Sequence, residues 1–301
     1  MFSFHDAVIV GTYLKKSPIA IRKYRLEMSD TAEVGNKDID IETIILELLP
    51  DLKKELGEDC AGVDDEQLLK FLYWKPSIER AAQRYRDFVY WKTTNPGIFD
   101  GTLRVSKDSE LERCLLSEVL VSPPLLRTKQ GGPILIGRLR NNDMTDGRTV
   151  DGVCRMIFYT IDSVANRPET QKHGVTIIHD LTGFDKSKNF KMEITKRLYH
   201  GLFGQFPVHI TAVYVCKAPL VVQAFFKLIS SLFMSKKVRN RIKFIDEFSE
   251  LSDVIDEDNL LIELGGTLEW NTKDWIEEQK KRELDGSMKS LTDIDPKKEV
   301  S

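Results

Sequence analysis

The sequence predicts an α/β fold in which an all-helical N-terminal domain precedes a domain built on a mostly parallel sheet. Up to residue 125, apolar side chains recur at three- and four-residue steps, which is the period of a helix that buries one face. After Gly131-Gly132, short apolar runs alternate with helical segments, a pattern typical of parallel strands joined by helical crossovers. The expected parts are an N-terminal segment (1–37), a helical domain (38–125), an α/β domain (126–276) and a charged, flexible tail (277–301).

The elements of the helical domain follow from its periodicity and from residues that begin or end helices. Ser77 is a good N-cap, with Glu79 in the first turn of the helix that follows it. Pro123-Pro124 closes the last helical segment, because proline cannot continue a helix. The expected helices cover residues 39–57, 64–75, 77–95 and 110–121.

The elements of the α/β domain are short apolar strands separated by longer helical segments. Strands are expected at 133–139, 174–180, 208–216 and 241–245, with helices at 149–167, 190–206 and 219–234 between them. This order predicts parallel strands, because a helix between two strands returns the chain to the same end of the sheet. From about Glu277 the chain is charged and poor in aliphatic residues, so we expect the tail to be frayed.

Composition excludes several classes of protein. The chain of 301 residues has a net charge of −3, so no overall basic field indicates nucleic acid as a partner. No segment approaches the ~18 uncharged apolar residues that a membrane span needs, and the N-terminus lacks the pattern of a secretory signal. We therefore expect a soluble, cytoplasmic and monomeric protein.

The motifs predict neither catalysis nor a metal site. The patterns G-x-S-x-G, G-x-x-x-x-G-K-[ST] and, after the first strand, G-x-G-x-x-G are absent. His179 and Asp180 are neighbours in a strand, so their side chains point to opposite faces and cannot cooperate directly. The cysteines are isolated and lack the spacing of a zinc site; they are Cys60, Cys114, Cys154 and Cys216. We expect reduced, buried thiols, no enzyme activity, no metal and no cofactor.

The segment 219–234 is the most informative physical feature. Its apolar side chains surround almost the whole helix, whereas an ordinary surface helix carries one apolar stripe. Either this helix is fully buried, or one face covers an apolar cavity while the other meets a membrane. The cations that follow it are Lys236, Lys237, Arg239 and Arg241. A basic cluster beside an apolar helix favours docking on an anionic membrane, although it also fits a solvated helix face.

A series of short motifs runs along the chain in a fixed order. In the helical domain they are Gln67-Leu-Leu-Lys-Phe-Leu72 and Tyr90-Trp91-Lys92. In the second domain they are Gly132-Pro133-Ile-Leu-Ile, Asp180-Leu181-x-Gly183, Phe206-Pro207, Ala218-Pro219 and Leu264-Gly265-Gly266-Thr267-Leu268. The ordered set resembles the CRAL-TRIO family of lipid-binding and lipid-transfer proteins over residues 60–270.

The resemblance implies a sheet that encloses an apolar cavity, with 219–234 as a movable lid. The implied lining residues are Cys154, Ile157, Ile161, Val175, Ile177, His179, Leu198, Leu202, Val208, Ile210, Val222, Phe225 and Leu228. The ligand would be one small hydrophobic lipid that is tocopherol-, retinoid- or phospholipid-like. Lys236, Lys237, Arg239 and Arg241 would meet the head groups of anionic or phosphoinositide-containing membranes during transient contact.

Some positions depart from the family pattern. Lys217 replaces the asparagine that usually precedes Ala-Pro. His209 and Thr211 replace cations of phosphoinositide-responsive relatives, which favours a broad anionic preference. His179, an imidazole among aliphatic neighbours, needs a hydrogen-bond partner, either a ligand hydroxyl, carbonyl or ester, or a water or backbone group. Besides a carrier, the sequence allows a lipid-gated sensor or scaffold that binds a protein partner or a phosphoinositide membrane.

Overall fold

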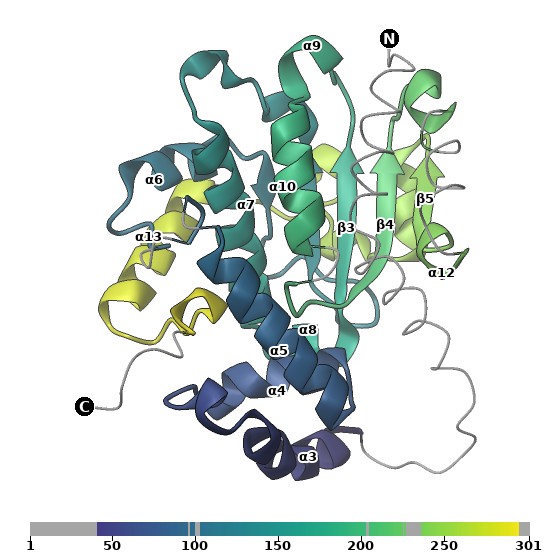
Figure 1. The fold of residues 1–301 in the computed structure, drawn as a ribbon. Helices are drawn as coiled ribbons and strands as arrows, with labels where there is room; N and C mark the ends of the chain where they lie inside the picture. The colour runs from purple at the N-terminus through teal and green to yellow at the C-terminus, as the bar shows by residue number, and fades with distance from the viewer. Residues whose placement is uncertain are drawn as a thin grey trace.

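The computed structural model describes residues 41–95, 97–99, 103–202, 205–224, 226 and 236–294. Of residues 41, 199, 200, 202 and 237 it describes the backbone alone. The expected N-terminal segment 1–37 and the expected lid residues Phe225 and Leu228 lie outside the described residues. Within them the chain forms helices around a central sheet, which is the predicted α/β class (Figure 1).

The helical domain begins with α3 (Ile41–Leu56), α4 (Asp65–Trp74) and α5 (Ile78–Thr93), which confirms the first three predicted helices. At the start of α4, the side chain of Asp64 accepts the backbone N–H of Glu66, which satisfies an otherwise unpaired amide. Aromatic rings hold α4 and α5 together: Phe71 lies edge-on against Tyr85 and Phe88, with ring centroids 5.5 and 5.8 Å apart.

The fourth predicted helix is wrong at its C-terminal end. α6 spans Ser109–Leu116, and Leu120–Val121 instead form the short strand β1, which pairs antiparallel with the next strand. Glu118 between them has a φ of 57°, a left-handed conformation that ends helical geometry. The β-branched residues on either side of Leu120 suit a sheet edge better than a helix.

The described sheet has five strands in the order β1-β2-β3-β4-β5. The longer strands are β2 (Ile134–Arg138), β3 (Val175–Asp180), β4 (Ile210–Cys216) and β5 (Ile242–Ile245). These four run parallel to one another, and β1 is the antiparallel edge. The four predicted strands and their parallel arrangement are therefore confirmed.

Helices connect the strands as the sequence predicts. They are α7 (Val150–Ala165), α8 (Pro168–His173), α9 (Lys186–Asn189), α10 (Met192–Leu202) and α12 (Lys236–Arg239). Every side chain of α7 from Gly152 onward is buried, so this helix forms the centre of the protein. α8 and α9 were not predicted; Pro168 begins α8, since proline suits the first turn.

The expectation of a flexible tail from residue 277 is wrong for the described part of this region. α13 (Thr272–Leu284) runs through that position, and Gln279, Met288 and Leu291, which lie beyond it in the chain, are buried. Residues 287–294, which we call the C-terminal strap, then return to α7. There the Ser290 hydroxyl and the Leu291 amide donate to the buried carboxylate of Asp162, at 2.5 and 3.0 Å. A few hydrogen bonds to Asp162 thus hold this short segment against α7.

Candidate functional site

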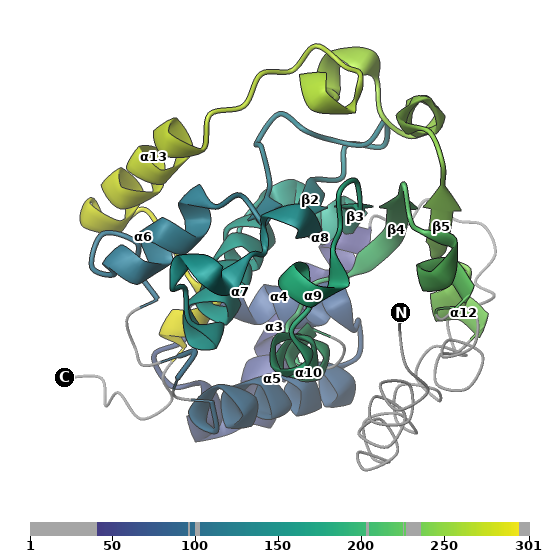
Figure 2. The same ribbon diagram turned by 90° about the horizontal axis from the view of Figure 1, so that it is seen from above.

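The two faces of the sheet are covered differently. Figure 2 shows α7, α10 and the helical domain on one side, which we call the front face, and the chain that follows β5 on the other, the back face. On the back face, Ile178, Tyr214 and Cys216 are buried in an apolar cluster with Leu251 and Ile255. That side is a conventional packed core.

Two rows of side chains cross the front face, because paired residues of parallel strands project to the same side. The first row is Leu135, Ile177, Val213 and Ile242, and the second is Gly137, His179, Val215 and Phe244. Apart from the buried Leu135 and the glycine, each of these side chains is only partly buried. Packed interiors leave few voids larger than a water molecule. The front rows are therefore not sealed into a packed core, in contrast to the back face.

A helix that follows β4 lies next to these rows. Residues 220–224 and 226 are helical, and the ring of Phe226 meets Phe244 of β5 edge-on at a centroid distance of 5.2 Å. On the outer side of the same helix, Leu220 and Val221 are 82% and 46% exposed. Full burial, one of the two alternatives for this helix, is therefore wrong for its described turns.

His179 is the polar member of the second row. A Cβ placed on Gly137 would lie 2.6 Å from the His179 Nδ1, so glycine leaves the room that the imidazole needs. Nδ1 is buried, and none of the described residues forms a hydrogen bond with the ring. Desolvation lowers the pKa of His179 to about 4, so the ring is neutral at physiological pH.

Most of the other expected lining residues gather at the front of the sheet. Ile157, Ile161, Val175, Ile177, Leu198 and Val208 belong to one apolar cluster with α7 and the helical domain. Cys154 is in this cluster too, but it is completely buried, and burial raises its pKa to about 12. Ile210 and Val222 are partly buried, while the side chain of Leu202 lies outside the described part. Ligand contact remains a prediction for all of them.

The basic cluster divides into groups with different surroundings. Lys236 is exposed, and Arg239 is partly buried. Arg241 donates to the backbone carbonyl of Ile210 at 2.8 Å and lies 3.1 Å from the His209 Nε2, so it fastens the start of β5 to the start of β4. The side chain of Lys237 lies outside the described part.

Sequence reasoning missed Val213, Val215, Ile242 and Phe244. The pairing of β3 with β4 shifts after Val175, which pairs with Ile210, whereas Thr176 pairs with Ala212. The extra residue forms a bulge, which reverses the set of alternate residues that face the front. Counting by twos along β4 from residues 208 and 210 therefore leads to the back face. In β5, the alternation Ile-Lys-Phe at residues 242–244 could have indicated that Ile242 and Phe244 share the apolar face of the strand.

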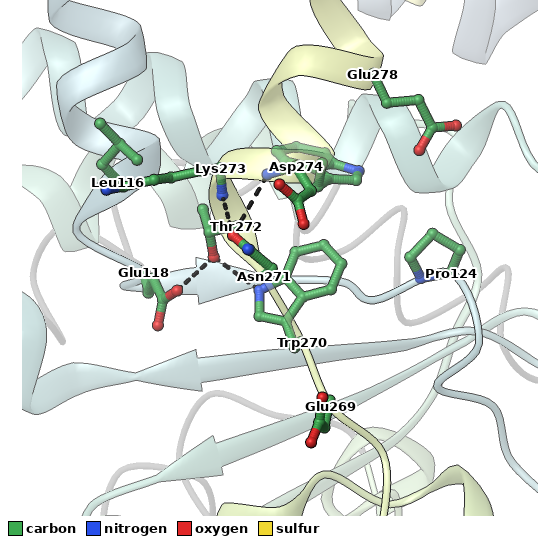
Figure 3. Close-up of a pocket in the computed structure, with 11 residues that line it drawn as sticks. Leu116, Glu118, Pro124, Glu269, Trp270, Asn271, Thr272, Lys273, Asp274 and Glu278 are labelled. Atoms are coloured by element: carbon green, nitrogen blue, oxygen red, sulfur yellow. Dashed lines mark hydrogen bonds between the residues drawn. The ribbon is translucent and has the colours of Figure 1, made fainter.

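A separate groove of about 830 Å³ lies between the end of α6 and the start of α13 (Figure 3). In this groove the hydroxyl of Thr272 donates a hydrogen bond to Glu118 and accepts one from the indole N–H of Trp270 at 2.7 Å. Its lining includes Glu269, Asp274 and Glu278 but none of the residues expected to contact lipid or head groups. This acidic, open groove does not suit an uncharged lipid.

Two further properties concern the described residues as a whole. They contain no group of three His, Cys, Asp or Glu side chains that could hold a metal ion. None of their helices combines the length and the apolar character needed to cross a membrane.

Comparison with known proteins gives matches to both halves of the chain. Residues 123–266 match the family model of the CRAL/TRIO domain. Tyrosine-protein phosphatase non-receptor type 9 of Rattus norvegicus is 29% identical over 123 residues, which are 41% of this chain but only 20% of the phosphatase. Alpha-tocopherol transfer protein-like of Homo sapiens is 26% identical over 262 residues, 85% of this chain and 72% of that protein. The crystal structure of Sfh5 shares the fold, with a TM-score of 0.52 and 13% identity over 84% of this chain and 100% of Sfh5.

Proposed function

We propose that this chain carries one small hydrophobic lipid and performs no chemistry on it. The proposal starts from residues 123–266, which are a CRAL/TRIO domain. The observation that carries the proposal is the front face of the sheet, where two apolar rows lie inside the fold and yet stay accessible. A tocopherol-, retinoid- or phospholipid-like molecule would occupy the space beside them. The relative whose name refers to tocopherol transfer matches 85% of the chain, which supports a carrier rather than a domain borrowed by a phosphatase.

Apolar contact supplies enough free energy for reversible binding. A lipid that buries ~300 Å² of apolar surface gains ~7 kcal/mol at ~25 cal/mol per Å², before the cost of ordering it. As a net free energy, ~7 kcal/mol would correspond to a dissociation constant of roughly 10 μM; the cost of ordering the lipid weakens binding from that value, and further contact with the lid strengthens it.

Exchange of the lipid would take place at a membrane. Opening the lid in water would expose Phe226, which now packs on Phe244, whereas opening it against lipid chains costs little. Leu220 and Val221 already offer apolar surface on the outer side. Lys236, which is exposed next to the lid, would attract anionic head groups over the ~8 Å screening length of physiological salt. We propose a cytoplasmic, monomeric carrier with transient membrane contact and a broad anionic preference.

Native mass spectrometry and solvent extraction of the full chain, purified from a eukaryotic host, test the proposal. We expect one lipid per chain, released on unfolding, and transfer of that lipid from donor to acceptor vesicles. Failure to carry lipid from the host, together with failure to take up lipid from vesicles, would contradict the proposal. Tight binding without transfer would favour the sensor or scaffold, and a changed lipid after incubation would indicate an enzyme.

A further inference from the structure

The two nitrogen atoms of His179 have different surroundings. The ring edge with Nδ1 and Cε1 rests on Gly137, where an added Cβ would approach these atoms to 2.6 and 3.2 Å. Nδ1 is buried there without a described partner. Nε2 also lacks a described partner but is not among the buried unpaired atoms, so it lies on the accessible part of this partly buried side chain. Nε2 therefore faces the space beside the sheet.

This arrangement selects one tautomer. Burial keeps the ring neutral, with its pKa lowered to about 4, so a single nitrogen carries hydrogen. If Nδ1 carried the hydrogen, this N–H would be buried against Gly137 without an acceptor. Buried N–H groups without an acceptor are rarer in proteins than buried acceptors without a donor, so the tautomer with hydrogen on Nε2 is favoured. Hydrogen on Nε2 instead presents a donor to the space that a lipid would fill.

We propose that the bound lipid carries an uncharged acceptor oxygen, in a carbonyl, ester or hydroxyl group, which receives the Nε2–H of His179. The inference rests on the proposed function, and it adds the chemical class of the ligand. His179 is the one polar side chain of the two rows, so an N–H there that finds no acceptor stays unsatisfied among apolar groups. The rows contain no cationic side chain, so they themselves offer no counter-charge to a carboxylate.

A pair of probes with matched chains tests this ligand class. Nonadecan-2-one, which has a ketone oxygen, and nonadecane, which has none, are mixed equally in neutral phosphatidylcholine vesicles and offered to the delipidated full chain. The protein is re-isolated, and the ratio of bound ketone to bound hydrocarbon is measured for the parent, for His179→Leu and for His179→Gln. Because the same vesicles serve every protein, partition of the probes into the bilayer cancels between them.

We expect the ratio to be on the order of tenfold higher for the parent than for His179→Leu, and to be largely restored in His179→Gln, whose amide can donate. Equal ratios in parent and His179→Leu would overturn the inference and leave the carrier intact, since both probes would still bind. Uptake of neither probe by the parent would overturn the carrier itself, and the inference with it. Nitrogen-15 spectra of the parent's histidines give a second readout: hydrogen on the Nδ1 of His179 would also overturn the inference.

Discussion

Replacing Ile177 by Trp should abolish lipid binding while leaving the delipidated protein almost as stable as the parent. Ile177 is a partly buried member of the first row on the front face. If the space beside it receives a lipid, the indole enters that space without displacing packed atoms. The free energy of unfolding should then change by less than about 1 kcal/mol, because nothing is overpacked.

Ile178 provides a matched control, since it is the next residue of the same strand and faces the other way. It is completely buried in the back-face cluster. Ile178→Trp must push packed neighbours aside, which typically costs about 1–3 kcal/mol of unfolding free energy. The folded fraction of this variant should still load lipid, because its front face is unchanged.

Urea unfolding of delipidated protein and native mass spectrometry of loaded protein measure the two effects separately. Delipidation matters because a bound ligand at 100 times its dissociation constant adds about 2.7 kcal/mol to apparent stability. The reasoning is refuted if Ile177→Trp loads lipid as well as the parent. It is also refuted if the two variants lose the same stability, since the front face would then be a packed core.

Four further outcomes are expected. In the unfolded chain His179 gains a proton near its ordinary pKa of 6.5, and in the folded protein only near 4, so the free energy of unfolding falls as pH drops from 6.5 to 4. His179→Gln should reduce that fall by up to roughly 3 kcal/mol, measured by urea titration at each pH. Ser290→Ala removes a donor from the buried Asp162, and should lower the free energy of unfolding by about 1–3 kcal/mol without changing lipid loading. Lys236→Glu should slow transfer to anionic vesicles about fivefold at low salt, with Lys54→Glu, at an exposed position of α3, as the control. Arg241→Glu, in contrast, should lower stability, because it breaks the bond to the Ile210 carbonyl.

The sequence predicted those elements whose stabilising contacts follow a local period. The strands β2 to β5 are apolar runs bounded by turn residues, and α7 is a largely apolar helix that begins at the capping Thr149. The prediction failed for elements whose position is set by contacts between residues far apart in the chain. α13 has little apolar surface, and the strap is held by hydrogen bonds to Asp162, a residue far away in the chain. At the bulge of β4, the hydroxyl of Thr211 donates to the Val175 carbonyl of the neighbouring strand at 3.1 Å.

The candidate site shows the same distinction, because it is defined by pairs of residues rather than by single positions. His179 stood out in the sequence as an imidazole among aliphatic neighbours, but its surroundings depend on the residue that pairs with it on the neighbouring strand β2. Gly137 was the indication in the sequence: a glycine inside a strand weakens the strand, and it often marks a position where another group approaches closely. The register of β2 with β3 places the two residues side by side, and the missing Cβ is what accommodates the ring. A glycine in a strand interior is therefore a reason to ask which side chain on the next strand occupies its face.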